Sequence, residues 1–331
     1  MELQEQLLRL GRRGAELRPF CKRAGVRHRG YSQRLQRVMV DFGAEHSFGK
    51  AAERVGEHYG IEVSAEAIRQ HTLRHGRSIN PLAAQAKAPA KTLIVEMDGS
   101  MIPVMEAGHG PDRRRGKQLF WREARLCLAR PSDRKQGLYG STLGSAETAG
   151  WVWREVALKA GLDDKTHVHG LGDGAPWIVD KFRDNFGSQG SYLLDFYHVS
   201  QYLAQAATSI VRTEKQREWT RRQQGRLLNN QSDKVLRSLQ AHLEPPNTAE
   251  APVSAAHRDL AERQDCLHYA NARASQLPIG SGEIESGHRH VVQRRLKLSG
   301  AWWKQTNAQA MLNLRTARAN NHWSHHWIPQ N

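Results

Sequence analysis

The chain has 331 residues, with 49 Lys and Arg against 33 Asp and Glu, so its formal net charge is +16 and its isoelectric point is near 10.1. This excess of positive charge favours a polyanionic partner, and it ranks nucleic acid ahead of an anionic membrane surface. No apolar run approaches the ~18 residues that a membrane span requires, and the three scattered cysteines form neither a disulfide framework nor a Cys-x-x-Cys zinc site.

The first 30 residues are strongly basic. Between Arg9 and Arg29 a single acid, Glu16, opposes eight Arg and Lys residues, which predicts a basic arm over residues 1–30 that contacts DNA phosphates. The opening "MELQEQLLRLGRRG" lacks the apolar core of a secretory signal, so a cytoplasmic protein is expected. The arm residues expected to bind DNA are Arg12, Arg13, Arg23 and Arg27.

Three helical patterns follow over residues 32–42, 47–59 and 64–75, and they predict a helix-turn-helix domain at residues 31–77. If Ile68 points inward, the opposite face of the third helix is exposed at 100° per residue. That face carries Glu66, Gln70, Arg74 and Arg77, and the last three are expected to contact DNA. The alternative is an ordinary helical hairpin with a solvated basic face.

The stretch "SINPLAAQAKAPA" reads as a linker over residues 78–90, and the character of the sequence changes after it. Strand patterns at 92–98, 119–130, 166–173 and 191–199 alternate with helical patterns at 145–162 and 177–186, which predicts a mixed α/β sheet. We expect a core at residues 91–205, a helical insertion at 206–275, returning helices of the core at 276–318 and a tail at 319–331.

Two aspartates each terminate a predicted strand and each precede a glycine: Asp98 in "VEMDGS" and Asp173 in "GLGDGAP". Ligands of open α/β sheets gather beyond strand ends, so two neighbouring strands of this kind bring carboxylates together. Like charges held that close favour a cation between them, and hard oxygen ligands suit Mg²⁺. The alternative is that each aspartate only caps a turn.

A two-metal site for phosphoryl transfer is normally completed by a third carboxylate, and "GSGEIESGHRHVVQ" offers Glu283 and Glu285. Counting helical positions places Val292 and Leu296 on the face of Glu285, which predicts that Glu285 lies over the apolar side that packs on the sheet. By the same count Glu283 shares a face with solvated bases. Glu285 is therefore the preferred third acid.

From Gly287 to Asn331 the chain carries seven Lys and Arg and no acid. A basic surface of this kind is expected to contact DNA. The expected contacts are Arg289, Arg294, Arg295 and Lys297. Tryptophan is mostly a core residue, but Trp219, Trp302 and Trp303 are alternatives for stacking on unpaired bases.

Five ordered motifs, "VEMDGSMIPV", "GLGDGAPWI", "LDFYHV", "PIGSGEIES" and "RRLKLSGAWW", resemble the catalytic region of bacterial insertion-sequence transposases of the Mutator-like superfamily, in particular the Kra group. The resemblance extends over residues 18–318. It implies an RNase H-like fold with an aspartate-aspartate-glutamate metal triad and a helical insertion before the glutamate. Matched position by position, the triad falls on Asp98, Asp173 and Glu285, and a Cys/Asp-x-x-His motif falls on Asp195 and His198.

The resemblance implies a DNA transposase that binds the terminal inverted repeats of an insertion sequence as at least a dimer. It would cut and join strands with two Mg²⁺ ions, for which Mn²⁺ substitutes. The alternatives are a metal-dependent nuclease without strand transfer and a non-catalytic DNA-binding protein derived from a transposase. His198 either lies beside the metal site or belongs, with Asp195, to a cap between strand and helix.

Overall fold

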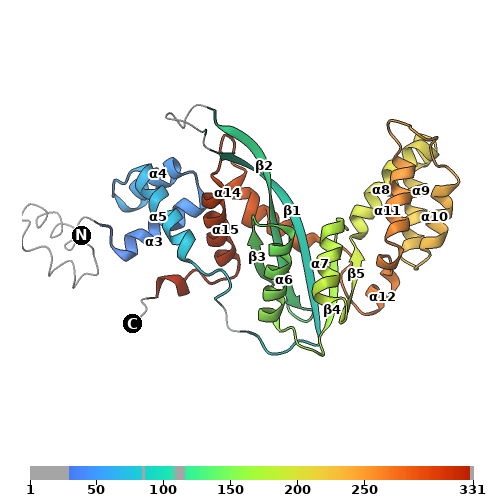
Figure 1. Ribbon diagram of the computed structural model, residues 1–331, viewed down its shortest axis with the longest axis horizontal. Coiled ribbons are helices and arrows are strands. Elements are labelled where there is room, and N and C mark those ends of the chain that lie inside the picture. The colour runs from blue at the N-terminus through green and yellow to red at the C-terminus, as the bar shows by residue number, and fades with distance from the viewer. Residues whose placement is uncertain (1–29, 84–85, 107, 109–115, 329–331) are drawn as a thin grey trace, which may run out of the picture. The chain divides into compact units, whose positions relative to one another are not determined.

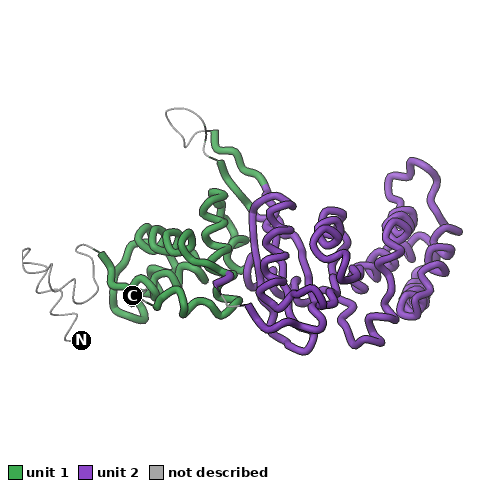
Figure 2. The backbone as a smooth tube through the Cα atoms, turned by 60° about the horizontal axis from the view of Figure 1, so that its bottom comes forward, with its two compact units in different colours: residues 1–81, 103–120, 293–331 green, residues 82–102, 121–292 purple. Residues whose placement is uncertain are grey.

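A computed structural model describes residues 30–83, 86–106, 108 and 116–328, so the expected basic arm lies outside the described residues. The chain forms two compact units, coloured separately in Figure 2. Unit 1 comprises residues 1–81, 103–120 and 293–331, and unit 2 comprises residues 82–102 and 121–292. In the described ranges, no helix has the length and apolar character that crossing a membrane would need.

Unit 1 begins with the three expected helices, α3 (Gln33–Glu45), α4 (Phe48–Tyr59) and α5 (Ala65–Ser78). Each starts after a serine whose hydroxyl accepts a hydrogen bond from a backbone N–H of the first turn, which is a strong local start signal. These caps are Ser32, Ser47 and Ser64. The helices bury a shared core of Met39, Ala51, Val55 and Ile68, and the face opposite Ile68 is exposed as expected.

The last long helix, α15 (Gln305–Ala319), packs against α5 within unit 1. The two backbones approach so closely at Gly76 that a Cβ atom there would lie 2.3 Å from the carbonyl oxygen of Ala310. The sequence had placed residues 276–318 with the catalytic core, but residues from Gln293 onward group with the N-terminal helices instead. The reason is long-range packing that no local pattern encodes.

Unit 2 is built on a five-stranded mixed sheet (Figure 1). Its strands are β1 (Thr92–Glu106), β2 (Gln118–Pro131), β3 (Leu138–Thr142), β4 (His167–Gly172) and β5 (Gly190–Leu194), in the spatial order β3-β2-β1-β4-β5. β4 runs parallel to both β1 and β5, and β3 is antiparallel to β2. This is the mixed α/β architecture that the sequence predicts.

Two helices, α6 (Ala146–Ala160) and α7 (Pro176–Phe186), lie side by side and cover the sheet (Figure 1). Their aromatic side chains Trp153, Phe182 and Phe186 meet at ring-centroid distances of 5.4–6.2 Å in the main core. Burial of such large apolar surfaces is the dominant favourable term in folding. The core therefore fixes the strand ends from which the candidate site is built.

Two strand ends differ from the sequence prediction. β1 does not stop at Asp98 but continues to Glu106, because the alternating residues after Asp98 extend the strand. β5 stops at Leu194, and Asp195 begins helix α8 (Phe196–Ile210). Asp98 therefore lies within a strand, whereas Asp173 directly follows one.

Helices occupy the region of the expected insertion: α8, α9 (Thr213–Leu227), α10 (Ser232–Gln240), α11 (Pro252–Glu262) and α12 (Tyr269–Ala274). Figure 1 shows α8 to α11 packed together. Trp219 is buried in this bundle, so its alternative role as a base-stacking residue is wrong. The chain then returns through α13 (Gly282–Gly287), a π-helical turn (His288–Gln293) and α14 (Arg294–Leu296).

Candidate active site

The two aspartates lie on neighbouring segments, Asp98 within β1 and Asp173 directly after β4. β1 and β4 are in parallel register up to Glu96, which lies opposite Leu171. Continuing this register by two residues brings Asp98 opposite Asp173. Opposite residues of adjacent strands project to the same face, and adjacent strands are about 4.7–4.9 Å apart. The topology thus places both carboxylates side by side at one edge of the β1–β4 pair.

Glu285 lies on α13 and its side chain is exposed, whereas Glu283 is partly buried in an ion pair. The guanidinium Nε of Arg130 donates to both carboxylate oxygens of Glu283, at 2.9 and 2.7 Å. Nη2 of Arg130 also donates to Glu283, and pairing through two guanidinium nitrogens is strong and specific. Glu283 therefore has a structural partner, and Glu285 is the acid left open to solvent.

The helix-face reasoning that selected Glu285 is wrong, although it named the open acid. It assumed 100° per residue from Glu285 to Val292 and Leu296, but the helix changes to a π turn at His288. A π turn inserts extra residues and shifts every later side chain around the axis. Glu285 consequently faces solvent while Val292 and Leu296 are buried.

Two buried carboxylates hold the start of α13. Glu96, two residues before Asp98, accepts a hydrogen bond of 2.8 Å from the backbone N–H of Ile284. Asp195 accepts 2.6 Å and 3.0 Å bonds from the first turn of α8, and its other oxygen accepts from the backbone N–H of Ser281 at 2.6 Å. Asp195 is thus the cap that one sequence alternative describes, and it also ties α8 to the segment carrying Glu285.

The electrostatics show that the three acids share one neighbourhood. Burial raises the pKa of Asp98, and the charges of Asp173, Glu285 and Glu123 raise it further, to about 6, against the lowering effect of the Gly99 N–H bond. Glu123 comes from β2, and a Cβ atom on Gly99 would lie 2.0 Å from its carboxylate. Asp98 therefore faces negative charge from β2, from α13 and from the loop after β4.

Two histidines border this cluster. His288, the first residue of the π turn, is buried with Nε2 3.4 Å from an Asp98 carboxylate oxygen. His198 on α8 contacts the Tyr202 hydroxyl at 3.1 Å. Burial, then Asp259 and Asp173, raises the pKa of Tyr202, which places the His198–Tyr202 pair near the second aspartate. His288 touches a candidate metal ligand directly, and His198 borders the cluster through Tyr202.

The carboxylates are turned towards backbone donors. One oxygen of Asp98 accepts from the N–H of Gly99 at 2.6 Å, and one of Asp173 accepts from Ala175 at 2.9 Å. Within the described ranges, no three His, Cys, Asp or Glu side chains are arranged to hold one metal ion. The donor set nevertheless consists of the hard oxygens that Mg²⁺ prefers. The magnesium site stays a prediction.

The expected DNA contacts divide into three groups. Gln70, Arg74 and Arg77 on α5 are exposed, and so are Arg289, Arg294 and Lys297. Arg295 is only 2% exposed, so its expected role as a DNA contact is wrong; it stacks between aromatic rings instead. The four arm residues, Arg12, Arg13, Arg23 and Arg27, lie outside the described residues.

Sequence reasoning missed three groups of this site: Glu96, Glu123 and the contact of His288 with Asp98. Glu96 occupies an apolar run, "TLIVEM", where a lone acid is a signal of a buried polar contact. Glu123 carries no such signal, because only the pairing of β1 with β2 brings it to Gly99. His288 follows Glu285 by one helical turn, but its burial depends on the π turn.

The model of the Uncharacterised protein family (UPF0236) matches residues 25–326 of the chain. No curated protein matches the sequence. Among solved structures, the chain is similar to the Drosophila P element transposase strand transfer complex, with 9% identity and a TM-score of 0.32 over 97% of this chain and 86% of that chain. A likeness at that score carries no functional argument. Because the family match spans most of its length, the chain belongs to the Uncharacterised protein family UPF0236.

Proposed function

We propose that the chain is a DNA transposase that binds the terminal inverted repeats of an insertion sequence and cuts and joins DNA strands by in-line phosphoryl transfer. The main support is that the β1–β4 register, continued two residues past Glu96 and Leu171, brings Asp173 beside Asp98, and that the charges of Asp173 and Glu285 raise the pKa of Asp98. Acids from three distant segments repel one another, and a divalent cation relieves that repulsion.

Asp98, Asp173 and Glu285 are the residues that would hold Mg²⁺, with Mn²⁺ as a substitute. Two such ions, when bound, activate the attacking oxygen and stabilise the leaving oxygen of a phosphodiester. Within the chain, Glu96 and Asp195 hold in place the segment that carries Glu285, and His288 lies 3.4 Å from the Asp98 carboxylate.

The fold proposed for this core is RNase H-like. The strand order β3-β2-β1-β4-β5, with β4 and β5 parallel to β1, fits that proposal. The helices between Asp195 and Ser281 occupy the position of an insertion before the third acid. An arrangement of this kind separates Glu285 from the aspartates in sequence while returning it to them in space.

DNA binding is assigned to the α3–α5 domain as a helix-turn-helix. Its third helix presents Gln70, Arg74 and Arg77 on one exposed face, a pattern suited to entering a major groove. Arg289, Arg294 and Lys297 provide a second exposed group of bases. Strand transfer joins two element ends at once, so at least a dimer is expected on DNA.

The test is an assay of cleavage and 3′-end joining, using DNA that carries the ends flanking the gene, a target plasmid and Mg²⁺. The wild-type chain should produce joined products. Asp98→Asn, Asp173→Asn and Glu285→Gln should each abolish both steps. Glu283→Gln is the matched control, because Glu283 pairs with Arg130 and should be dispensable for chemistry.

The assay also separates the alternatives. Cleavage without joining would identify a metal-dependent nuclease, and DNA binding without cleavage would identify a non-catalytic protein. Loss of activity in Glu283→Gln together with full activity in Glu285→Gln would overturn the assignment of the third acid.

A further inference from the structure

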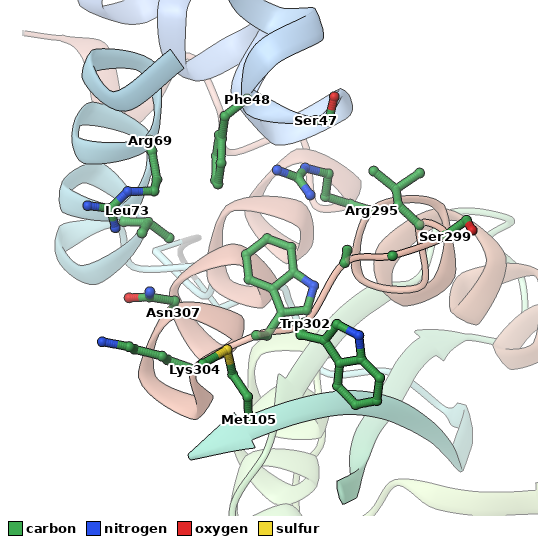
Figure 3. A pocket seen from close by; sticks show the side chains of 14 residues that line it. Ser47, Phe48, Arg69, Leu73, Met105, Arg295, Ser299, Trp302, Lys304 and Asn307 are labelled. Atoms are coloured by element: carbon green, nitrogen blue, oxygen red, sulfur yellow. The ribbon is translucent and has the colours of Figure 1, made fainter. Parts of the chain in front are cut away.

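Unit 1 contains an open cavity of about 470 Å³ to which the proposed function assigns no role (Figure 3). Its walls come from the start of α4, from α5, from the end of β1 and from the segment 295–307. Figure 3 shows Phe48 and Arg295 on one side of the hollow and Lys304 and Met105 on the other. The volume falls in the range of about 300–1,000 Å³ that is typical of small-ligand sites.

The cavity has an aromatic wall. Trp302 lines it and is 41% exposed, which is unusual for a residue type that is buried on average. Trp303 beside it is buried, and its indole lies 6.3 Å from the ring of Phe48 in an edge-to-face contact. Backbone hydrogen bonds of 2.8 and 3.2 Å tie Trp303 to β1, so the segment that presents Trp302 is anchored.

The floor is a buried cation. The guanidinium of Arg295 lies over the rings of both Phe48 and Trp303, 4.7 and 4.8 Å from their centroids, and its Nε donates to the Gly43 carbonyl at 3.1 Å. Burial, and then the charge of Arg315, lowers the pKa of Arg295 to about 10, so it stays charged at neutral pH. A fixed positive charge beneath an aromatic wall attracts rings that carry electron-rich oxygen and nitrogen atoms.

The rim adds polar and basic groups. Lys304 is exposed, and Asn307 contributes an amide whose oxygen accepts from Arg77 at 2.9 Å. Arg69 also lines the rim, although its charge is balanced by hydrogen bonds of 2.7 and 2.6 Å to Glu66. Among the described residues that line the cavity, none is acidic. The electrostatic character is therefore suited to a group attached to an anionic chain.

The aromatic wall and the positive charges together favour a ligand that has both an aromatic ring and a negative charge. A small anion would use the cations but not the indole, and an apolar side chain of a protein would use the indole but not the cations. A nucleobase uses both, because it stacks on an aromatic face while its adjoining phosphate faces a base. We propose that the cavity receives one unstacked nucleobase of DNA, held against Trp302 with its phosphate near Lys304. This rests on the proposed DNA-processing function, since a protein that cuts and joins strands meets unpaired bases, which stack on aromatic side chains.

The test compares two single strands of equal length that carry the same phosphate charge, one an oligothymidylate and one built from abasic units. Binding to the full-length chain is measured without divalent cations. The wild-type chain should prefer the strand with bases, and Trp302→Ala should weaken oligothymidylate binding by about 5- to 150-fold while leaving abasic binding unchanged. Trp302→Phe should keep most of the preference, because the aromatic face remains.

Two control variants complete the design. Trp151→Ala removes another exposed tryptophan, 67% accessible on α6 of unit 2, and should change nothing. Lys304→Ala should weaken both strands equally. Equal binding of the two strands by the wild type, or an intact preference in Trp302→Ala with an unchanged melting temperature, would overturn the proposal.

The strand-binding test of the cavity and the joining assay of the transposase proposal can fail independently of each other. A chain that shows the base preference but fails the joining assay loses the transposase function and keeps the cavity assignment. A chain that joins ends but shows no preference loses only the cavity assignment.

Discussion

At the scale of single residues, the loop around Asp173 explains why that aspartate lies between glycines. A Cβ atom on Gly172 would lie 2.4 Å from the Tyr192 hydroxyl oxygen, so a larger residue does not fit. Gly174 has a φ of +83°, and its Cβ atom would lie 2.3 Å from a methyl group of Leu194. The glycines are packing requirements that let the chain turn sharply and present Asp173 at the end of β4.

Gly174→Ala should therefore destabilise the protein more than Gly60→Ala. Both positions have positive φ, which costs a residue with a side chain about 1–2 kcal/mol. A Cβ atom at position 60 has nothing within 4 Å, whereas a Cβ atom at position 174 meets Leu194, and this overpacking costs a further amount of about 1–3 kcal/mol. Urea unfolding measures the difference, and equal losses of unfolding free energy would contradict this reading.

The residues of the candidate site were only partly predictable. Asp98 and Asp173 stand out because each follows an apolar strand pattern, and their register was set by β1–β4 pairing. Glu285 was named by a helical count that the π turn invalidates, so that choice depended on the resemblance. Arg295 was predicted to be exposed because it is charged, but it is buried against two aromatic rings.

At the scale of secondary-structure elements, Asp195 joins α8 to the start of α13. It accepts hydrogen bonds from Tyr197, His198 and Ser281 while almost fully buried. Asp195→Ala should leave these three donors unpaired and lower the free energy of unfolding by at least about 3 kcal/mol, since each unpaired buried group costs about 1–3 kcal/mol. If the proposed function holds, the variant should also slow strand cleavage about 10- to 100-fold, because the helix that carries Glu285 loses its support.

Asp233→Ala is the control for this prediction. Asp233 is an exposed partner of Arg237 in the insertion, and such pairs contribute below about 1 kcal/mol. Chemical unfolding and cleavage rates measure both variants. Equal stability and activity of Asp195→Ala and Asp233→Ala would remove the linking role of Asp195.

A second element-scale feature is the histidine contact between α5 and the C-terminal segment. His75 lies 2.9 Å from a ring nitrogen of His326 and 4.5 Å from the Trp327 ring centroid. Burial, followed by the charges of His326, Arg74 and His71, lowers the pKa of His75 from 6.5 to about 4. As the pH falls from about 6.5 to about 4, this histidine takes up a proton in the unfolded chain but not yet in the folded chain. The free energy of unfolding therefore falls over this pH range.

His75→Gln should flatten that pH dependence. Glutamine keeps a polar group at the contact but does not titrate. The melting temperature, measured between pH 4 and pH 7, should fall less steeply on acidification in the variant than in the wild type. Identical slopes would show that His75 contributes nothing to the acid sensitivity.

The elements themselves were largely predictable where local signals were strong. Each of the first three helices starts at a serine cap and carries helical apolar spacing, and their observed bounds lie close to the expected ones. The end of β1 was not predictable, because Gly99 resembles a strand terminator but only makes room for Glu123. The end of β5 was missed because Asp195 caps a helix within an apolar run.

At the scale of the whole molecule, the net charge of +16 predicts salt-sensitive DNA binding. The logarithm of the affinity should fall linearly with the logarithm of the salt concentration. Arg74→Ala should reduce that slope by about one, which is the expectation for one lost phosphate contact. Arg237→Ala, which removes an exposed arginine paired with Asp233, is the control and should leave the slope unchanged. Equal slopes for wild type and Arg74→Ala would exclude α5 as the DNA-contacting face.

The sequence patterns did not predict which helices group together in each compact unit. The alternation of strands and helices predicted a mixed sheet, but it did not determine that α15 packs with the N-terminal helices. Close packing at Gly76 and Ala310 determines that grouping, and both residues are unremarkable in sequence. Long-range contacts of this kind depend on three-dimensional fit between segments and leave no periodic trace.

The most direct measurement is anomalous scattering from Mn²⁺ in crystals of the full chain. We expect an anomalous peak in contact with Asp98, Asp173 and Glu285, which Glu285→Gln removes or weakens and Glu283→Gln leaves intact. A peak bound elsewhere, or one that contacts Glu283 in place of Glu285, would contradict it.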